Sequence, residues 1–230
     1  MEYPQPYTLA ATAPTVPPHP MLVAVVGQQY CCPHPVDLAI VRMVLTLADK
    51  FTVTDINSNV VFKLGVSLLT LHDHRVLLDV AQNPVVTLRR KIMTMHDRWQ
   101  AFRGDSSDPK DLIFSLKRSS LIQLVRTELD VFLASNTSEQ VCDFKIKGSW
   151  LGRSCVVYAG ESNTIVAQMH EKHTFQSIAF GKTNFMVTVH PNVDYAFIVA
   201  LIVILDEINQ DGRYKKTHHH QQNLPTEFPT

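Results

Sequence analysis

The sequence has few of the features that would place it in an unusual class of protein. Among 230 residues it has only 8 glycines and 4 cysteines, and its 21 Lys and Arg residues are balanced by 21 Asp and Glu residues. The low glycine content excludes a collagen-like chain, and the lack of net charge excludes nucleic-acid binding driven by overall charge. A hydrophobic fraction of 45% with 18% charged residues is typical of a globular protein. We therefore expect any electrostatic recognition to be local.

The common signatures of enzymes are also missing. The chain has neither a P-loop nor a Rossmann glycine pattern, and we interpret Gly148 with Gly152 as a turn between strands. Ser154 and Ser162 lack the glycine-flanked elbow of a hydrolase, and no Cys has a His at a spacing that indicates catalysis. We expect a non-enzymatic protein with no catalytic residue and no cofactor.

The N-terminal region does not have the composition of a secretory signal. The first Lys or Arg is Arg42, and four prolines between positions 14 and 20 interrupt the only candidate apolar run. We therefore expect an intracellular, cytoplasmic protein that is not secreted. In a reducing compartment the four cysteines, Cys31, Cys32, Cys142 and Cys155, should be thiols, and the glycosylation sequon at Asn136 should go unused.

Both ends of the chain differ in composition from the middle. Residues 1–20 hold six of the thirteen prolines and a single charge, which predicts a disordered leader. Residues 211–230 are polar and include His218, His219 and His220, which predicts a flexible tail. The part between them, residues 21–210, is expected to be a single domain.

Short runs of β-branched and aromatic residues separated by turn residues dominate this middle part, which indicates a mostly β domain. Two of the units share an Asp and an Asn four residues apart, Asp55 with Asn59 and Asp79 with Asn83, and each unit is predicted to be a hairpin. About a dozen strands at hairpin spacing imply a barrel or a sandwich. The expected strands are 51–54, 60–64, 76–79, 85–89, 99–102, 112–116, 129–133, 142–146, 155–158, 164–169 and 185–189; residues 121–128 fit either a helical turn or a strand.

The longest apolar run, Tyr195 to Leu205, has eleven residues and is bounded by Asp194 and Asp206. As a helix it would extend about 16 Å, roughly half of a ~30 Å hydrocarbon core, so it is too short to span a bilayer. β-Branched residues in the run favour a strand, whereas its length, the carboxylate of Asp194 in a first turn and Gly212 as a stop favour a helix. A helix that is apolar all round must be enclosed by protein, and in a β-rich chain the natural enclosure is a barrel. The residues expected to fill it are Tyr195, Phe197, Ile198, Leu201, Ile202 and Leu205.

Several long strings closely resemble the plant LURP-one-related family over about residues 28–210. They include CPHPVDLAIVR from Cys32, NPVVTLRRK from Asn83, MHDRWQAFRG from Met95, CDFKIKGSWLGRSCVVYAGES from Cys142 and NFMVTVHPNVDYAFIVALIVILDEIN from Asn184. The resemblance implies a tubby-like fold, in which a closed antiparallel barrel of about twelve strands encloses a hydrophobic C-terminal helix, similar to phospholipid scramblases. It also implies a link to plant defence and, by analogy with tubby proteins, a membrane-tethered transcription regulator at the plasma membrane or in the nucleus.

Three groups of residues are candidates for binding. A basic cluster could contact anionic phospholipid or phosphoinositide, the alternative being solvated strand faces balanced by Asp97, Asp105 and Asp111. Cys31 and Cys32 could be acylated, the alternative being two small buried thiols. The pairs His72 with His74 and His170 with His173 lack Cys or carboxylate companions, so we expect no metal site. The basic cluster consists of Arg89, Arg90, Lys91, Lys117 and Arg118, with Arg98 and Arg103 on nearby runs.

These features lead to one main hypothesis, a non-enzymatic binding or regulatory module. The alternative is a scramblase-like, lipid-interacting membrane protein, although the sequence has no acidic calcium loop. Specific binding to nucleic acid is not expected from a neutral chain without a recognition helix.

Overall fold

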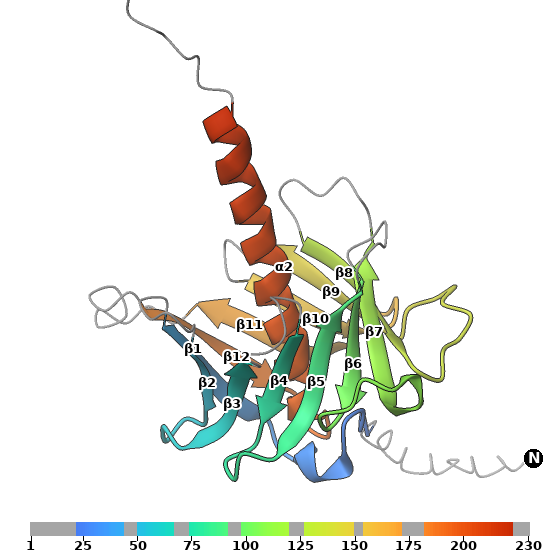
Figure 1. Ribbon diagram of the computed structural model, residues 1–230. Helices are drawn as coiled ribbons and strands as arrows, with labels where there is room; N and C mark the ends of the chain where they lie inside the picture. The colour runs from blue at the N-terminus through green and yellow to red at the C-terminus, as the bar shows by residue number, and fades with distance from the viewer. Residues whose placement is uncertain are drawn as a thin grey trace, which may run out of the picture.

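The computed structural model describes residues 22–43, 50–66, 74–91, 98–119, 127–149, 154–171 and 182–222. These residues form twelve strands, one long helix and two short 3-10 helices (Figure 1). The strands are β1 (Val36–Met43), β2 (Lys50–Thr54), β3 (Val60–Val66), β4 (His74–Leu78), β5 (Pro84–Arg90), β6 (Trp99–Arg103), β7 (Leu112–Arg118), β8 (Thr127–Leu133), β9 (Phe144–Ser149), β10 (Ser154–Ala159), β11 (Ile165–Glu171) and β12 (Lys182–Val189). The helices are η1 (Gln28–Tyr30), η2 (Pro109–Asp111) and α2 (Tyr195–Gln222).

Every strand pairs antiparallel with its neighbours in the chain, and β1 also pairs with β12, which closes the sheet into a barrel. Val36 lies opposite Val189 at one end of this closing pair, and Met43 lies opposite Lys182 at the other. The expected barrel is therefore confirmed. The residue pattern did not mark β1 as a strand, although Leu38 and Ile40 alternate toward the core.

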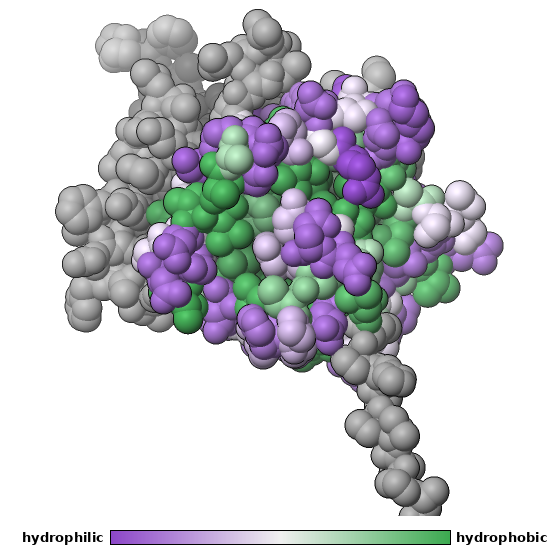
Figure 2. All heavy atoms as spheres, turned by 90° about the horizontal axis from the view of Figure 1, so that it is seen from below, coloured by the Kyte–Doolittle hydropathy of each residue, from purple (hydrophilic) through white to green (hydrophobic). Residues whose placement is uncertain are grey.

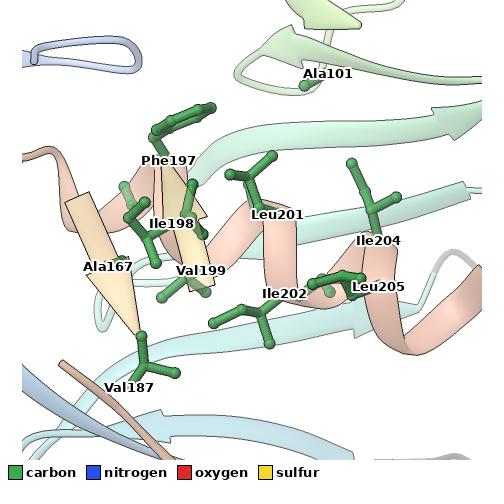
Figure 3. Packing of buried hydrophobic residues seen from close by; sticks show 14 of the residues in the cluster. Ala101, Ala167, Val187, Phe197, Ile198, Val199, Leu201, Ile202, Ile204 and Leu205 are labelled. Atoms are coloured by element: carbon green, nitrogen blue, oxygen red, sulfur yellow. The ribbon is translucent and has the colours of Figure 1, made fainter. Parts of the chain in front are cut away.

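The helix α2 runs through the barrel (Figure 1). Its residues from Ala196 to Leu205 are all at most 3% exposed, so side chains on every side of the helix are buried against the inner wall (Figure 3). Phe197 packs against Phe114 and Phe144 with ring centroids 5.2 and 5.0 Å apart. The enclosed helix predicted over residues 195–205 is confirmed, and it forms the centre of the hydrophobic core.

Both ends of the helix differ from the sequence-based expectation. Asp194 is the residue before the first turn, where its Oδ1 accepts a hydrogen bond from the N–H of Phe197 at 3.0 Å, so it caps the helix and is not part of its first turn. At the other end α2 continues past Gly212 to Gln222, so the predicted stop is wrong. A glycine inside a helix costs only about 1 kcal/mol, which does not break a helix that its buried half already holds in place.

We use "lower end" for the end of the barrel where α2 begins and "upper end" for the end where α2 leaves it, as they lie in Figure 1. The described connections 55–59, 79–83, 104–111, 134–143 and 160–164 all lie at the lower end, together with residues 22–35 and 190–194. The predicted leader at residues 1–20 and the undecided segment at 121–126 lie outside the described residues.

The two predicted Asp/Asn hairpins are confirmed and have the same internal geometry. The Oδ1 atom of Asp55 accepts hydrogen bonds from the backbone N–H groups of Asn57 and Asn59, both at 2.8 Å. The Oδ1 atom of Asp79 accepts from the N–H of Asn83 at 2.8 Å in the same way. The residues with left-handed backbone are Ser58 and Gln82, both with φ of 67°, and not the Asx residues themselves.

Gly148 is not in a turn, contrary to the expectation. It lies in β9 opposite Cys155 of β10, with φ of 151°. A Cβ atom there would collide with the carbonyl oxygen of Ser154, so the close approach of β10 requires glycine. Gly152 lies outside the described residues.

Candidate functional site

The lower end of the barrel is closed by a buried carboxylate. Asp194 is 0% exposed, and its Oδ2 atom accepts hydrogen bonds from the N–H groups of Val25, Val26 and Gly27 at 3.1, 2.7 and 2.9 Å. These contacts hold the segment before η1 against the start of α2, and Val23 forms a parallel bridge with Val193 beside them. Both oxygens of the carboxylate thus accept hydrogen bonds from backbone N–H groups of the same chain, so the role of Asp194 is to position the helix.

The upper end of the barrel carries the predicted basic cluster. Arg89, Arg90 and Lys91 lie at the end of β5, and Lys117 with Arg118 at the end of β7, with β6 between them. The fold therefore brings these residues to one region of the barrel. Their side chains nevertheless divide between the two faces of the wall. Two residues on the outer face, Arg89 and Lys91, are exposed.

The remaining members of the cluster are less accessible. Arg90 lies opposite the buried Trp99, and Arg118 lies opposite the buried Leu129, so both occupy positions on the inner face. Lys117 points outward, with its ammonium 4.5 Å from the centre of the Phe132 ring. The five predicted contact residues thus do not form one continuous exposed patch.

A carboxylate from the β8–β9 connection neutralises part of the outer face. Glu139 accepts two hydrogen bonds of 2.6 Å from the Arg98 guanidinium, and its Oε2 lies 3.4 Å from the Lys117 ammonium. The hydrogen bonds from Arg98 and the neighbouring positive charges hold the pKa of Glu139 at about 2, below its ordinary value of 4.5. The acids that the sequence suggested as balancing charges are elsewhere. Asp105 and Asp111 lie at the lower end, and Asp97 lies outside the described residues.

A second ion pair joins the upper wall to the helix where α2 leaves the barrel. Arg75 of β4 donates hydrogen bonds to the carboxylate of Glu207 at 2.8 and 3.1 Å, and both side chains are less than one fifth exposed. Glu207 follows the apolar part of α2 by two residues, so this pair fixes the position of the helix along the barrel axis.

Cys31 and Cys32 lie at the lower end, beside the start of α2. The Cys31 thiol donates to the carbonyl oxygen of Val23 at 3.7 Å, and burial raises the pKa of this thiol above its ordinary value of 9.0. The backbone carbonyl of Cys32 accepts a short hydrogen bond from the N–H of Asn192 at 2.6 Å. Both cysteines are free and half-buried. Acylation at either one stays a prediction.

The structure also reveals a polar cluster that the sequence analysis did not predict. Ligand atoms of Asp130, Cys142 and Glu161 lie within 4.8 Å of one another. The ammonium of Lys145 already supplies a positive charge there, 2.6 Å from Glu161 and 3.5 Å from Asp130. Burial and the bond to Glu161 raise the pKa of the Cys142 thiol to about 12, so it is a neutral donor. This cluster is an internal ion-pair network.

The paired histidines are not brought together by the fold. His74 lies in β4 and His170 in β11, and five strand-to-strand steps separate β4 from β11 around the barrel. His72 and His173 lie outside the described residues. Within the described ranges, no helix has an apolar stretch long enough to cross a membrane.

The fold and these sites define a class of protein: a closed twelve-stranded antiparallel barrel whose interior is occupied by its own C-terminal helix. The sequence model of the LURP-one-related family matches residues 36–206, from the first residue of β1 to Asp206, which directly follows the apolar part of α2. The chain therefore belongs to the LURP-one-related family, as the sequence strings indicated.

Several relatives of known sequence come from Arabidopsis thaliana. The chain is 56% identical to Protein LURP-one-related 15 over 214 residues, which cover 91% of this chain and 98% of the relative. It is 55% identical to Protein LURP-one-related 10 over 82% of this chain and 98% of that relative. An X-ray structure of a protein from the same plant is 51% identical, has a TM-score of 0.65, and is matched over 81% of this chain and 98% of that one.

Proposed function

We propose that the chain is a non-enzymatic binding module that contacts anionic phospholipid headgroups with the upper end of β4–β7. The observation that carries this proposal is the concentration of cations there in a chain without net charge. The described part of these four adjacent strands has no Asp or Glu, and, apart from Arg103 at the lower end of β6, seven basic residues lie on the strands or next to their upper ends. They are Arg75, Arg89, Arg90, Lys91, Arg98, Lys117 and Arg118.

The strength of such a contact depends on how many cations reach the headgroups. A basic residue near an anionic membrane surface contributes about 1 kcal/mol, and this contribution falls off within a Debye length. Arg89 and Lys91 are exposed and face outward, so they contribute most directly. Lys117 contributes less, because Glu139 lies 3.4 Å from its ammonium. We therefore expect weak, reversible and salt-sensitive binding.

The burial of α2 favours a peripheral module over the scramblase-like alternative. The apolar stretch of α2, which suggested a membrane segment, is packed inside the barrel with at most 3% exposure from Ala196 to Leu205. A regulatory role in plant defence, as the resemblance implies, would then come from recruiting partners to a membrane surface. A membrane-tethered transcription regulator, which the resemblance also implies, would be released from the membrane when this lipid contact is broken.

Flotation with vesicles tests the lipid contact. Wild-type protein should float with vesicles of phosphatidylcholine and phosphatidylserine at low salt, and should stay behind with phosphatidylcholine alone. The double variant R89E/K91E should lose flotation. Lys110→Glu, which reverses an exposed charge at the opposite end, is the matched control and should float like the wild type. Absence of wild-type flotation at low salt, or equal loss in both variants, would overturn the proposal.

A further inference from the structure

The lower end of the barrel has the opposite charge from the upper end. Its connections, 22–35, 55–59, 79–83, 104–111, 134–143, 160–164 and 190–194, hold nine acidic residues and one Lys, and Arg103 adds a second base at the lower end of β6. Two of the acids add little to the charge of this end, because Glu139 pairs with Arg98 and Lys117 and Asp194 is buried. The acids are Asp55, Asp79, Asp105, Asp108, Asp111, Glu139, Asp143, Glu161 and Asp194, and the Lys is Lys110. Among the residues that the structure describes, charge is thus unevenly distributed along the barrel axis, with the excess of acids at the lower end. An acidic end repels anionic lipid and attracts cationic partners.

Two of these acids stand next to exposed apolar side chains. Ile56 follows Asp55 and is 71% exposed, and Val80 follows Asp79 and is 62% exposed. Both lie at the tips of hairpins with the same internal geometry, and the hairpins are neighbours because β3 pairs with β4. Leu22, at the same end of the barrel, is 51% exposed. Seen from below, apolar surface lies between the polar side chains (Figure 2).

The two hairpin tips are held in one conformation by their own hydrogen bonds. The Asp55 and Asp79 carboxylates bind backbone N–H groups and the side-chain amides of Asn59 and Asn83. These bonds also lower the pKa of both carboxyl groups, led by the bond from the Asn side chain, so both charges persist well into the acidic range. Each tip therefore presents an apolar side chain beside a fixed negative charge. Because the tip is already held in one conformation, binding a partner would not cost the free energy of ordering a loop.

We propose that the hairpin tips at Ile56 and Val80 form a docking surface for a cationic, amphipathic peptide segment of another protein. Apolar side chains of the partner would cover Ile56 and Val80, and its Lys or Arg residues would lie near the surrounding carboxylates. This surface uses different residues from the proposed lipid contact and lies at the opposite end of the barrel. One molecule could therefore bind both at once, but neither contact requires the other.

The full chain can be tested with a designed peptide as the probe. A fluorescent amphipathic peptide of Leu and Lys should bind more tightly than the matching peptide of Leu and Glu. Added salt should weaken the binding of the Lys peptide. The double variant I56S/V80S should lose about tenfold or more in affinity, because it removes two apolar contacts without changing charge. Val141→Ser is the matched control, since Val141 is also 62% exposed at the lower end but lies between β8 and β9, across the barrel. The affinity of V141S for the peptide should stay within about twofold of the wild-type affinity.

Several results would overturn the proposal. Equal affinity for the Lys and Glu peptides would show that charge does not select the partner. Equal losses of peptide affinity in I56S/V80S and V141S would show that the peptide does not bind specifically at the hairpin tips. Self-association that I56S/V80S abolishes would assign the surface to a second copy of the chain, and loss of vesicle flotation in that variant would assign it to lipid. If R89E/K91E keeps full peptide affinity while losing flotation, the two binding surfaces are separate.

Discussion

Replacement of Asp194 by alanine tests how the lower end of the barrel is closed. The change removes the acceptor of four backbone N–H groups, those of Val25, Val26, Gly27 and Phe197. Val26 and Phe197 are 4% and 0% exposed, so water cannot replace the lost acceptor for their N–H groups. A buried donor left without an acceptor costs about 1–3 kcal/mol, and losing a helix cap costs about 1 kcal/mol. We expect a total loss of about 3–5 kcal/mol, a large fraction of the roughly 5–15 kcal/mol that stabilises a domain.

Urea unfolding followed by circular dichroism measures this loss directly. Asp194→Ala should lower the free energy of unfolding by that amount, and should lower the melting temperature by roughly 10 °C for a domain of this size. Asp194→Asn should lose only about 1–2 kcal/mol, because the amide oxygen can still accept from the three N–H groups that Oδ2 serves. Asp37→Ala, on the exposed outer face of β1, is the control. If Asp194→Ala lowers the free energy of unfolding no more than Asp37→Ala does, the Asp194 carboxylate does not hold the lower end of the barrel closed.

Variants at two further positions, Ile202 and Glu139, test other parts of the structure. Ile202 is 3% exposed inside the barrel, so Ile202→Asp should unfold the protein or make it aggregate by burying an unpaired charge, while Ile202→Leu should cost less than about 1.5 kcal/mol; a folded Ile202→Asp variant on gel filtration would contradict the enclosed helix. The pKa of Glu139 is lowered to about 2 from 4.5, so its contribution to stability is fully present above pH 4.5 and is lost as the pH falls toward 2. Glu139→Gln should therefore flatten this acid limb of the unfolding free energy by about 1 kcal/mol once solvent screening is included, and an unchanged limb would show that the pairing with Arg98 contributes nothing.

The parts of the fold that were predictable have signals within a short stretch of sequence. The run from Tyr195 to Leu205 is apolar on all sides and bounded by carboxylates, which is enough to predict an enclosed element too short for a membrane. The Asp/Asn spacing at Asp55 and Asp79 indicates a hairpin because the carboxylate bonds the backbone of its own turn. In both cases the interactions that decide the structure lie within a few residues of each other.

The unpredicted features depend on contacts between distant residues. β1 closes the barrel by pairing with β12, and neither strand carries information about the other in its own pattern. The pairing of Arg98 with Glu139 joins β6 to a connection 41 residues further along. The charge polarity along the barrel could not be seen in the composition, because it appears only once the alternating strand directions assign each connection to an end.

The placement of α2 has a consequence for how the protein is made. The ribosome finishes all twelve strands before it adds the helix that they enclose, so the emerging chain has inward-facing apolar residues on every strand and nothing to pack them against. The pairing of β1 with β12 also joins the first strand to the last, a non-local contact of the kind that slows folding. We therefore expect the nascent barrel to stay open, or to be held by a chaperone, until the apolar part of α2 has left the ribosome. A chain that stopped before Tyr195 would contain every strand and still lack the centre of its core.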